Sequence, residues 1–125
     1  MKRDLDIVRN LLLAIEAQSV AETNRAFAPS GFVQEDLEAH MPLLIDRQLI
    51  EAKDWSTLKT RGWGMVRLTW EGHDFLDSVR DPEVWRKTKE GLDAAGGFTF
   101  ELMKSLAKGL VKKKIEKHTG IELDL

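Results

Sequence analysis

The chain of 125 residues contains no cysteine. This absence excludes a disulfide framework, a thiolate metal site and a thiol nucleophile, and it fits the reducing cytoplasm. The sequence also lacks any apolar run that approaches the length of a membrane span. Its first residues, Met1 to Asp6, carry acidic side chains where a signal peptide would have its apolar core. We therefore expect a soluble, cytoplasmic protein.

The residue patterns that most enzymes need are missing as well. The three histidines are His40, His73 and His118, and none lies four residues from another, so a zinc site is not predicted. His40 is expected to be a packed or capping side chain, and His73 to pair with Asp77 on a helix. No glycine loop is followed by the lysine of a phosphate-binding motif. We expect a protein that is not an enzyme and has no metal, cofactor or small-molecule substrate.

Charge is distributed unevenly along the chain. Hydrophobic residues make up 42% and charged residues 32% of the sequence, which is ordinary for a globular protein. Residues 1–81 contain 10 Lys and Arg against 14 Asp and Glu, whereas residues 82–125 contain 9 against 7. A domain that binds nucleic acid usually has the opposite sign, so the acidic first part counts against DNA binding.

The stretch from Val66 to Val79 organises the prediction of the fold. Val66 and Leu68 alternate with polar residues, and apolar residues then recur at helical spacing, so a strand ends and a helix begins near Thr69. Thr69 is predicted to cap that helix, and Gly72 to let another backbone approach it closely. A helix, a β-hairpin and a second helix in this order suggest a winged helix.

The predicted fold is α+β and mostly helical, a winged helix-turn-helix with a small wing and a C-terminal helical hairpin. Its elements are a core helix from Asp4 to Ala17, a recognition helix from Gln34 to Gln48 and a wing from Ile50 to Leu68. Residues 18–32 fit either a short helix or an irregular strand. Pro42 is expected to kink or divide the recognition helix, because it lacks an N–H group and its ring clashes with the preceding turn.

Residues 82–125 are predicted to form a helical hairpin, and residues 1–81 the winged-helix domain. Asp81-Pro82-Glu83 is a strong helix start, and Leu102, Leu106 and Leu110 are expected to form the buried stripe of the last helix. The basic run Lys112 to Lys114 with Lys117 is diluted by nearby acidic residues, so membrane binding is not expected. We expect the hairpin to pack on the first domain or to mediate homodimerisation.

Two kinds of partner fit the charged and aromatic residues of the first domain. A DNA-binding regulator would use basic and aromatic residues on phosphates and bases, namely Arg47, Lys53, Lys59, Arg61, Trp63 and Arg67. A protein-interaction module would dock a host or phage protein through Glu35, Asp36, Glu38, Trp55 and Trp63. In a third interpretation, the tryptophans only cover the hairpin and the lysines are solvated.

Several blocks of residues resemble a known family over nearly the whole chain. The most specific block is Leu68-Thr69-Trp70-Glu71-Gly72-His73-Asp74-Phe75-Leu76-Asp77, supported by Leu12-Leu13-Ala14-Ile15-Glu16, Leu49-Ile50-Glu51 and Val84-Trp85. Together they resemble a phage- and prophage-associated domain of unknown function, of the DUF2513 type. The resemblance implies a winged-helix-like fold in a protein from a bacterium or its phage. It implies no activity and no site residues.

Overall fold

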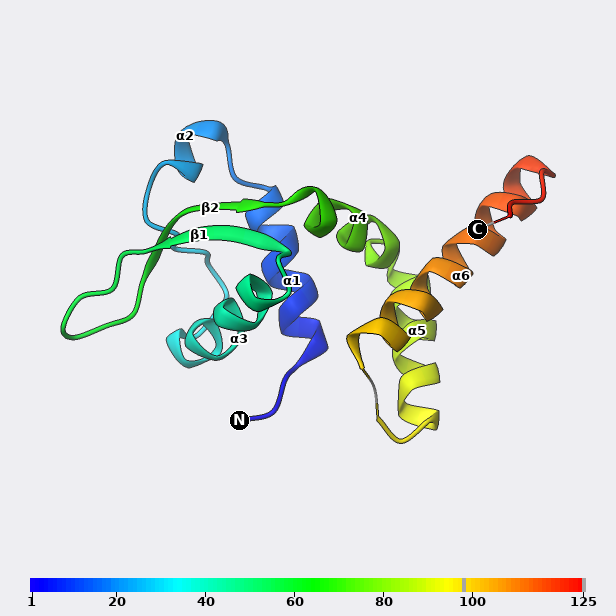
Figure 1. The fold of residues 1–125 in the computed structure, drawn as a ribbon, viewed down its shortest axis with the longest axis horizontal. Helices are drawn as coiled ribbons and strands as arrows, with labels where there is room; N and C mark the ends of the chain where they lie inside the picture. The colour runs from blue at the N-terminus through cyan, green and yellow to red at the C-terminus, as the bar shows by residue number, and fades with distance from the viewer. Residues whose placement is uncertain (98, 125) are drawn as a thin grey trace. The chain divides into compact units, whose positions relative to one another are not determined.

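The computed structural model describes residues 1–97 and 99–124. In chain order the elements are α1 (Leu5–Glu16), α2 (Val20–Thr23), α3 (Gln34–Asp46), β1 (Ile50–Asp54), β2 (Trp63–Leu68), α4 (Trp70–Val79), α5 (Pro82–Ala94) and α6 (Phe100–Thr119) (Figure 1). The fold is therefore α+β and mostly helical, with a two-stranded antiparallel sheet, as predicted. In the described ranges no helix is both long and apolar enough to cross a membrane.

The chain divides into two compact units, Met1–Leu76 and Asp77–Leu125, with the boundary inside α4. Unit 1 contains α1 to β2 and the first turns of α4, and α1 packs on both β2 and α3. Its core includes Leu11, Leu12, Met41 and Leu44, all at most 2% exposed. The amphipathic spacing of α1 and α3 brings these side chains to one face of each helix, and that burial holds unit 1 together.

His40 belongs to this core, as predicted, with 2% of its surface exposed. Its Nε2 accepts a hydrogen bond from the backbone N–H of Asp4 at 3.0 Å, and its Nδ1 donates to the carbonyl of Asp36 at 2.9 Å. The ring therefore ties the start of α1 to α3 and has both nitrogens satisfied. By contrast, Asp77 pairs with Arg80 at 2.8 Å instead of with His73, which corrects the predicted ion pair.

Helix α3 runs without interruption from Gln34 to Asp46 through Pro42, so the expected division of this helix is wrong. The buried side chains of α3 lie both before and after the proline, and they anchor the helix on both sides of it. Their burial outweighs the missing hydrogen bond to the carbonyl of Glu38.

Both alternatives for residues 18–32 occur, one after the other. Ser19 and Glu22 form a capping box that starts the short helix α2. The chain then becomes extended, with an isolated antiparallel bridge between Ala26 and Gly64 and a 2.8 Å bond from the N–H of Phe27 to the carbonyl of Trp63. This segment therefore covers part of the outer edge of β2.

Strand β2 contains a bulge at Met65. Glu51 pairs with Arg67 and Lys53 with Gly64, so two residues of β2 lie opposite Ala52. Met65 adopts a left-handed φ of 54° that is unusual for a residue other than glycine. The extra residue lets Trp63 and Val66, which are three positions apart, both reach the core.

The turn from β2 into α4 forms as predicted. The Oγ1 of Thr69 accepts from the N–H of Gly72 at 3.0 Å and donates to the carbonyl of Gln48 at 2.6 Å. A Cβ at Gly72 would lie 1.9 Å from the carbonyl oxygen of Leu49. The glycine therefore allows α4 to begin directly against the segment between α3 and β1.

Unit 2 is the helical hairpin of α5 and α6, which pack on each other. Asp81 caps α5 as predicted, and its carboxylate accepts from the N–H groups of Glu83 and Val84. In α6, however, Met103 and Ala107 are buried and Leu102 is 57% exposed, so the predicted buried stripe is wrong at Leu102. The most buried residues of α6 are therefore Met103 and Ala107, while Leu106 packs against Gly91 of α5, where an added Cβ would lie 2.8 Å from its side chain.

Candidate interaction surfaces

The loop of residues 55–62 between the two strands, called here the hairpin loop, is an ordered and exposed part of unit 1 (Figure 1). Thr57 fixes its tip, because its N–H donates to the carbonyl of Thr60 at 2.8 Å and its hydroxyl accepts from the N–H groups of Lys59 and Thr60. Leu58, between these residues, is fully exposed at 108%. The loop therefore holds a large apolar side chain in water on a hydrogen-bonded turn.

Two further contacts attach the hairpin loop to the rest of unit 1. The side chain of Gln34, at the start of α3, donates to the carbonyl of Arg61 at 2.8 Å. The ring of Trp55 covers Gly64, where an added Cβ would lie 2.0 Å from a ring atom, and the tryptophan is still 42% exposed. These contacts hold the loop in place, and the rest of the Trp55 ring is open to solvent.

The predicted DNA-contacting residues are only partly available. Trp63 is 4% exposed, so it belongs to the core and is corrected as a contact for either kind of partner. Arg61 lies 5.1 Å from the centre of the Trp63 ring, and Arg67 pairs with Glu51 at 2.5 Å. Arg47 caps the C-terminal end of α3. The remaining two, Lys53 and Lys59, are exposed on the hairpin.

An acidic side chain also accompanies the basic ones near the loop. Asp54 accepts from the N–H of Ser56 at 2.8 Å. Hydrogen bonding to Ser56 lowers the pKa of Asp54, and the charge of Arg61 lowers it further. Asp54 therefore stays ionised and offsets part of the positive charge around Arg61.

The side of α3 opposite its buried residues, called here the α3 outward face, is acidic. Its helical spacing brings together Glu35, Glu38, Ala39, Pro42 and Asp46. Three carboxylates thus surround two small side chains, and among the described residues no basic side chain pairs with Glu35 or Glu38. Asp36, predicted with them, lies beside this face and is half-buried. Sequence reasoning places Glu35, Glu38 and Asp46 among the polar positions of this helix, and the helical period brings Asp46 to the same face because α3 continues through Pro42.

Unit 2 contains a groove between α5 and α6 that the sequence prediction missed, called here the lysine groove. Its volume is about 360 Å³, and it is lined by Asp81, Glu83, Val84, Lys87, Leu110, Lys113, Lys114 and Lys117. Val84 and Leu110 form its apolar part. Lys87 comes from α5. The other three lysines, at positions 113, 114 and 117 of α6, lie opposite the first turns of α5.

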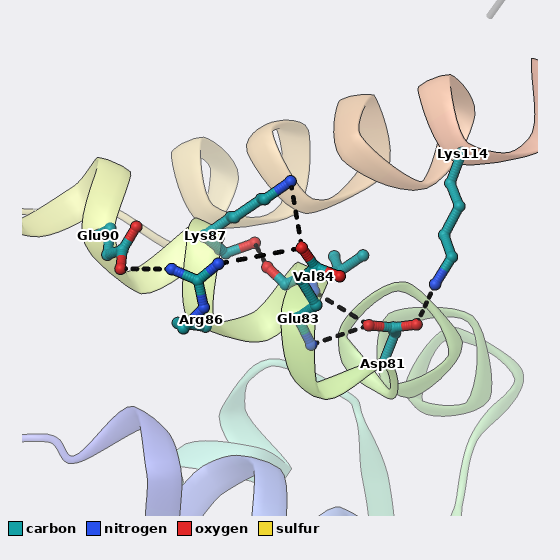
Figure 2. Close-up of polar contacts among 8 residues, drawn as sticks. Asp81, Glu83, Val84, Arg86, Lys87, Glu90 and Lys114 are labelled. Carbon is teal, nitrogen blue, oxygen red and sulfur yellow. Dashed lines mark hydrogen bonds and ion pairs between the residues drawn. The ribbon is translucent and has the colours of Figure 1, made fainter. Parts of the chain in front are cut away.

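Figure 2 shows the ion pairs and hydrogen bonds of charged side chains in and beside the lysine groove. Asp81 accepts a short bond from Lys114, and this bond, with those from the α5 backbone, lowers the pKa of Asp81. Glu83 lies 3.5 Å from Lys87, and Arg86 pairs with Glu90 at 2.7 Å (Figure 2). Lys113 and Lys117 have no acidic partner in the part of the chain that the structure describes. They are four residues apart, so two like charges remain neighbours on α6.

Nothing in the described ranges gathers three or more side chains that would hold a metal ion. Unit 1 presents the exposed Trp55 and Leu58 on the hairpin loop and an acidic face on α3, and unit 2 presents a basic groove.

Comparison with known proteins gives a family and no activity. The family described as "Hypothetical protein (DUF2513)" matches residues 2–98. A curated "Uncharacterized protein" of Haemophilus influenzae is 33% identical over 119 residues, which cover 92% of this chain and 99% of the relative. No solved structure matches the chain significantly. With a family match over more than half of its length, the chain belongs to the DUF2513 family.

Proposed function

We propose that the chain is a non-enzymatic protein-interaction module built on a winged-helix-like scaffold. In this interpretation α3 occupies the position of a recognition helix and β1–β2 that of the wing. The order of α1, α3, hairpin and α4 supports it, as does the bridge at Ala26, which adds a third extended segment beside β2. The phage or prophage setting, which the family resemblance implies, and the cytoplasmic location, which the lack of cysteine fits, are part of the same proposal.

The observation that carries the proposal is the fully exposed Leu58 on an ordered turn. A large apolar side chain held on a hydrogen-bonded turn presents surface that a partner can bury, and the hydrogen bonds of the loop reduce the entropy lost when it docks. Trp55 lies at the base of the same loop. Tryptophan is enriched among the residues that dominate protein–protein interfaces, and Leu58 adds apolar surface on the same loop.

The electrostatics of α3 favour a protein over DNA as the partner. A recognition helix that reads base edges needs donor side chains, whereas the α3 outward face has carboxylates around Ala39 and Pro42. Phosphates would be repelled by that face. In the wing, Arg67 is paired with Glu51 and Arg61 lies near Asp54, so most of the uncompensated positive charge comes from the exposed Lys53 and Lys59.

Photo-crosslinking tests the proposal directly. A benzoylphenylalanine at position 58 is expected to give a discrete protein adduct in cells that express the chain. The same group at position 20 is the matched control, because Val20 is 85% exposed but lies outside the hairpin loop. Mass spectrometry of the adduct then identifies the partner. Equal adducts from both positions would contradict a role for the loop.

Fluorescence anisotropy with a random DNA duplex gives the second readout. At low salt we expect no binding by the wild-type protein and no change in Lys59→Glu/Arg61→Glu. Binding that weakens steeply with salt and is lost in that double variant would replace the protein-interaction proposal with DNA binding through the wing.

A further inference from the structure

We propose that the α3 outward face of one copy docks in the lysine groove of a second copy, so that the chain forms a two-fold dimer. The contact does not involve the hairpin loop and does not depend on the proposed function. In a two-fold dimer it occurs twice, because each copy supplies one face and one groove.

The charges of the two surfaces are complementary. Glu35, Glu38 and Asp46 lie on one side of α3, whereas Lys113 and Lys117 line the groove without an acidic partner among the described residues. Bringing the two together relieves the repulsion between neighbouring like charges on each helix. It also brings the carboxylates of α3 close enough to the lysines of the groove for charge pairing to select and orient the partner.

The apolar parts of the two surfaces correspond as well. Ala39 and Pro42 form a smooth centre between the carboxylates of α3, and Val84 and Leu110 form the apolar part of the groove between the lysines. Small side chains on α3 allow its backbone to approach the groove closely, as small residues do at helix–helix contacts. From Glu35 to Glu38 the helix rises about 4.5 Å, which is close to the rise of about 6 Å from Lys113 to Lys117 on α6.

The acidic residues inside the groove explain why a helix fits better than a nucleic acid. Asp81 and Glu83 line the same groove, and both are engaged by lysines, Lys114 and Lys87. Continuous phosphates would meet these carboxylates, whereas spaced carboxylates on a helix reach Lys113 and Lys117 while small side chains pass the acidic positions.

The test measures the mass of the full chain by sedimentation in 50 mM and 500 mM NaCl. We expect a dimer whose dissociation constant rises roughly tenfold or more at the higher salt, because exposed charge pairs are screened. Lys113→Glu/Lys117→Glu and Glu35→Lys/Glu38→Lys should each be monomeric at 50 mM NaCl. The matched control is Lys104→Glu/Lys108→Glu, which changes the net charge equally on α6 outside the groove and should remain dimeric.

Recombining the charges decides between a specific contact and a general loss of attraction. A one-to-one mixture of the two monomeric variants, or one chain with all four substitutions, should regain the wild-type mass. A wild-type protein that is monomeric at 50 mM NaCl would overturn the proposal. So would a dimer that survives both charge reversals, or a failure of the four-fold variant to recover. Leu58→Asp should leave the dimer intact, so the outcome is separate from that of the hairpin loop.

Discussion

Substitution of Gly72 by alanine tests the close approach on which the end of unit 1 depends. The new Cβ would lie 1.9 Å from the carbonyl oxygen of Leu49, where ordinary contact begins near 3.4 Å. The obstacle is backbone, so α4 must move by about 1.5 Å, the difference between those distances. That movement breaks the bonds from the N–H and Oγ1 of Thr69 to the carbonyls of Leu49 and Gln48.

The expected loss of stability follows from these contacts. Two lost hydrogen bonds contribute about 2 kcal/mol, and loosened packing of Phe75 and Leu76 about 1–2 kcal/mol more. The better helix propensity of alanine offsets roughly 1 kcal/mol, which leaves a net loss of about 2–3 kcal/mol. Urea unfolding followed by circular dichroism measures this value.

Gly109 provides the matched control for this substitution. It lies inside α6, and an added Cβ would meet nothing within 4 Å. Gly109→Ala should therefore stabilise unit 2 by about 0.5–1 kcal/mol, the ordinary gain of alanine over glycine in a helix. A Gly72→Ala protein as stable as the wild type, or more stable, would refute the proposed backbone approach.

Three further predictions concern the helix ends and the proline. Pro42→Ala restores an N–H in the middle of α3 and should stabilise unit 1 by roughly 2 kcal/mol, because the restored helix hydrogen bond outweighs the added entropy of the unfolded chain. Urea unfolding measures this gain, and a loss of stability would contradict it. Gln48 has a left-handed φ of 58° where α3 ends, so Gln48→Gly should raise stability by about 0.5–1 kcal/mol in the same assay, whereas Gln48→Ala should not. The bonds from Lys114 and from the α5 backbone lower the pKa of Asp81 from its usual value of 3.8. The ionised carboxylate therefore contributes to folding stability above pH 3.8, and this contribution is lost as the pH falls further. Between about pH 4 and pH 2, thermal unfolding should therefore show a smaller drop in α5–α6 stability for Asp81→Asn than for the wild type. An equal drop in both proteins would contradict this role.

The sequence was sufficient for features that depend on local chemistry. The cap at Thr69, the glycine at position 72 and the helix start at Asp81 each follow from residue types at fixed spacing, and the structure contains all three. The satisfied ring of His40 was also predictable, because no other metal ligand accompanies it.

Features that depend on tertiary packing could not be predicted in the same way. Pro42 has a strong local tendency to break a helix, and only the burial of Met41 and Leu44 overrides it. In α6 the buried face includes Met103 and Ala107 instead of Leu102, which the spacing of the leucines alone does not reveal. The lysine groove was missed for a related reason. Acidic and basic residues alternate along this part of the sequence, and the sequence alone does not show which lysines pair with Asp81 and Glu83.

The bulge at Met65 affects how relatives of this chain should be aligned. On the α4 side of the bulge, the inward-facing residues of β2 have even numbers, as at Val66 and Leu68. On the other side of the bulge, the inward-facing Trp63 has an odd number. A relative that lacks the extra residue would need a one-residue gap here, and an ungapped alignment would match its buried aromatic with Gly64 instead of Trp63. Deleting Met65 alone would place Trp63 two positions from Val66, the spacing at which a regular strand keeps both side chains on one face, so both should stay buried while the left-handed residue is lost.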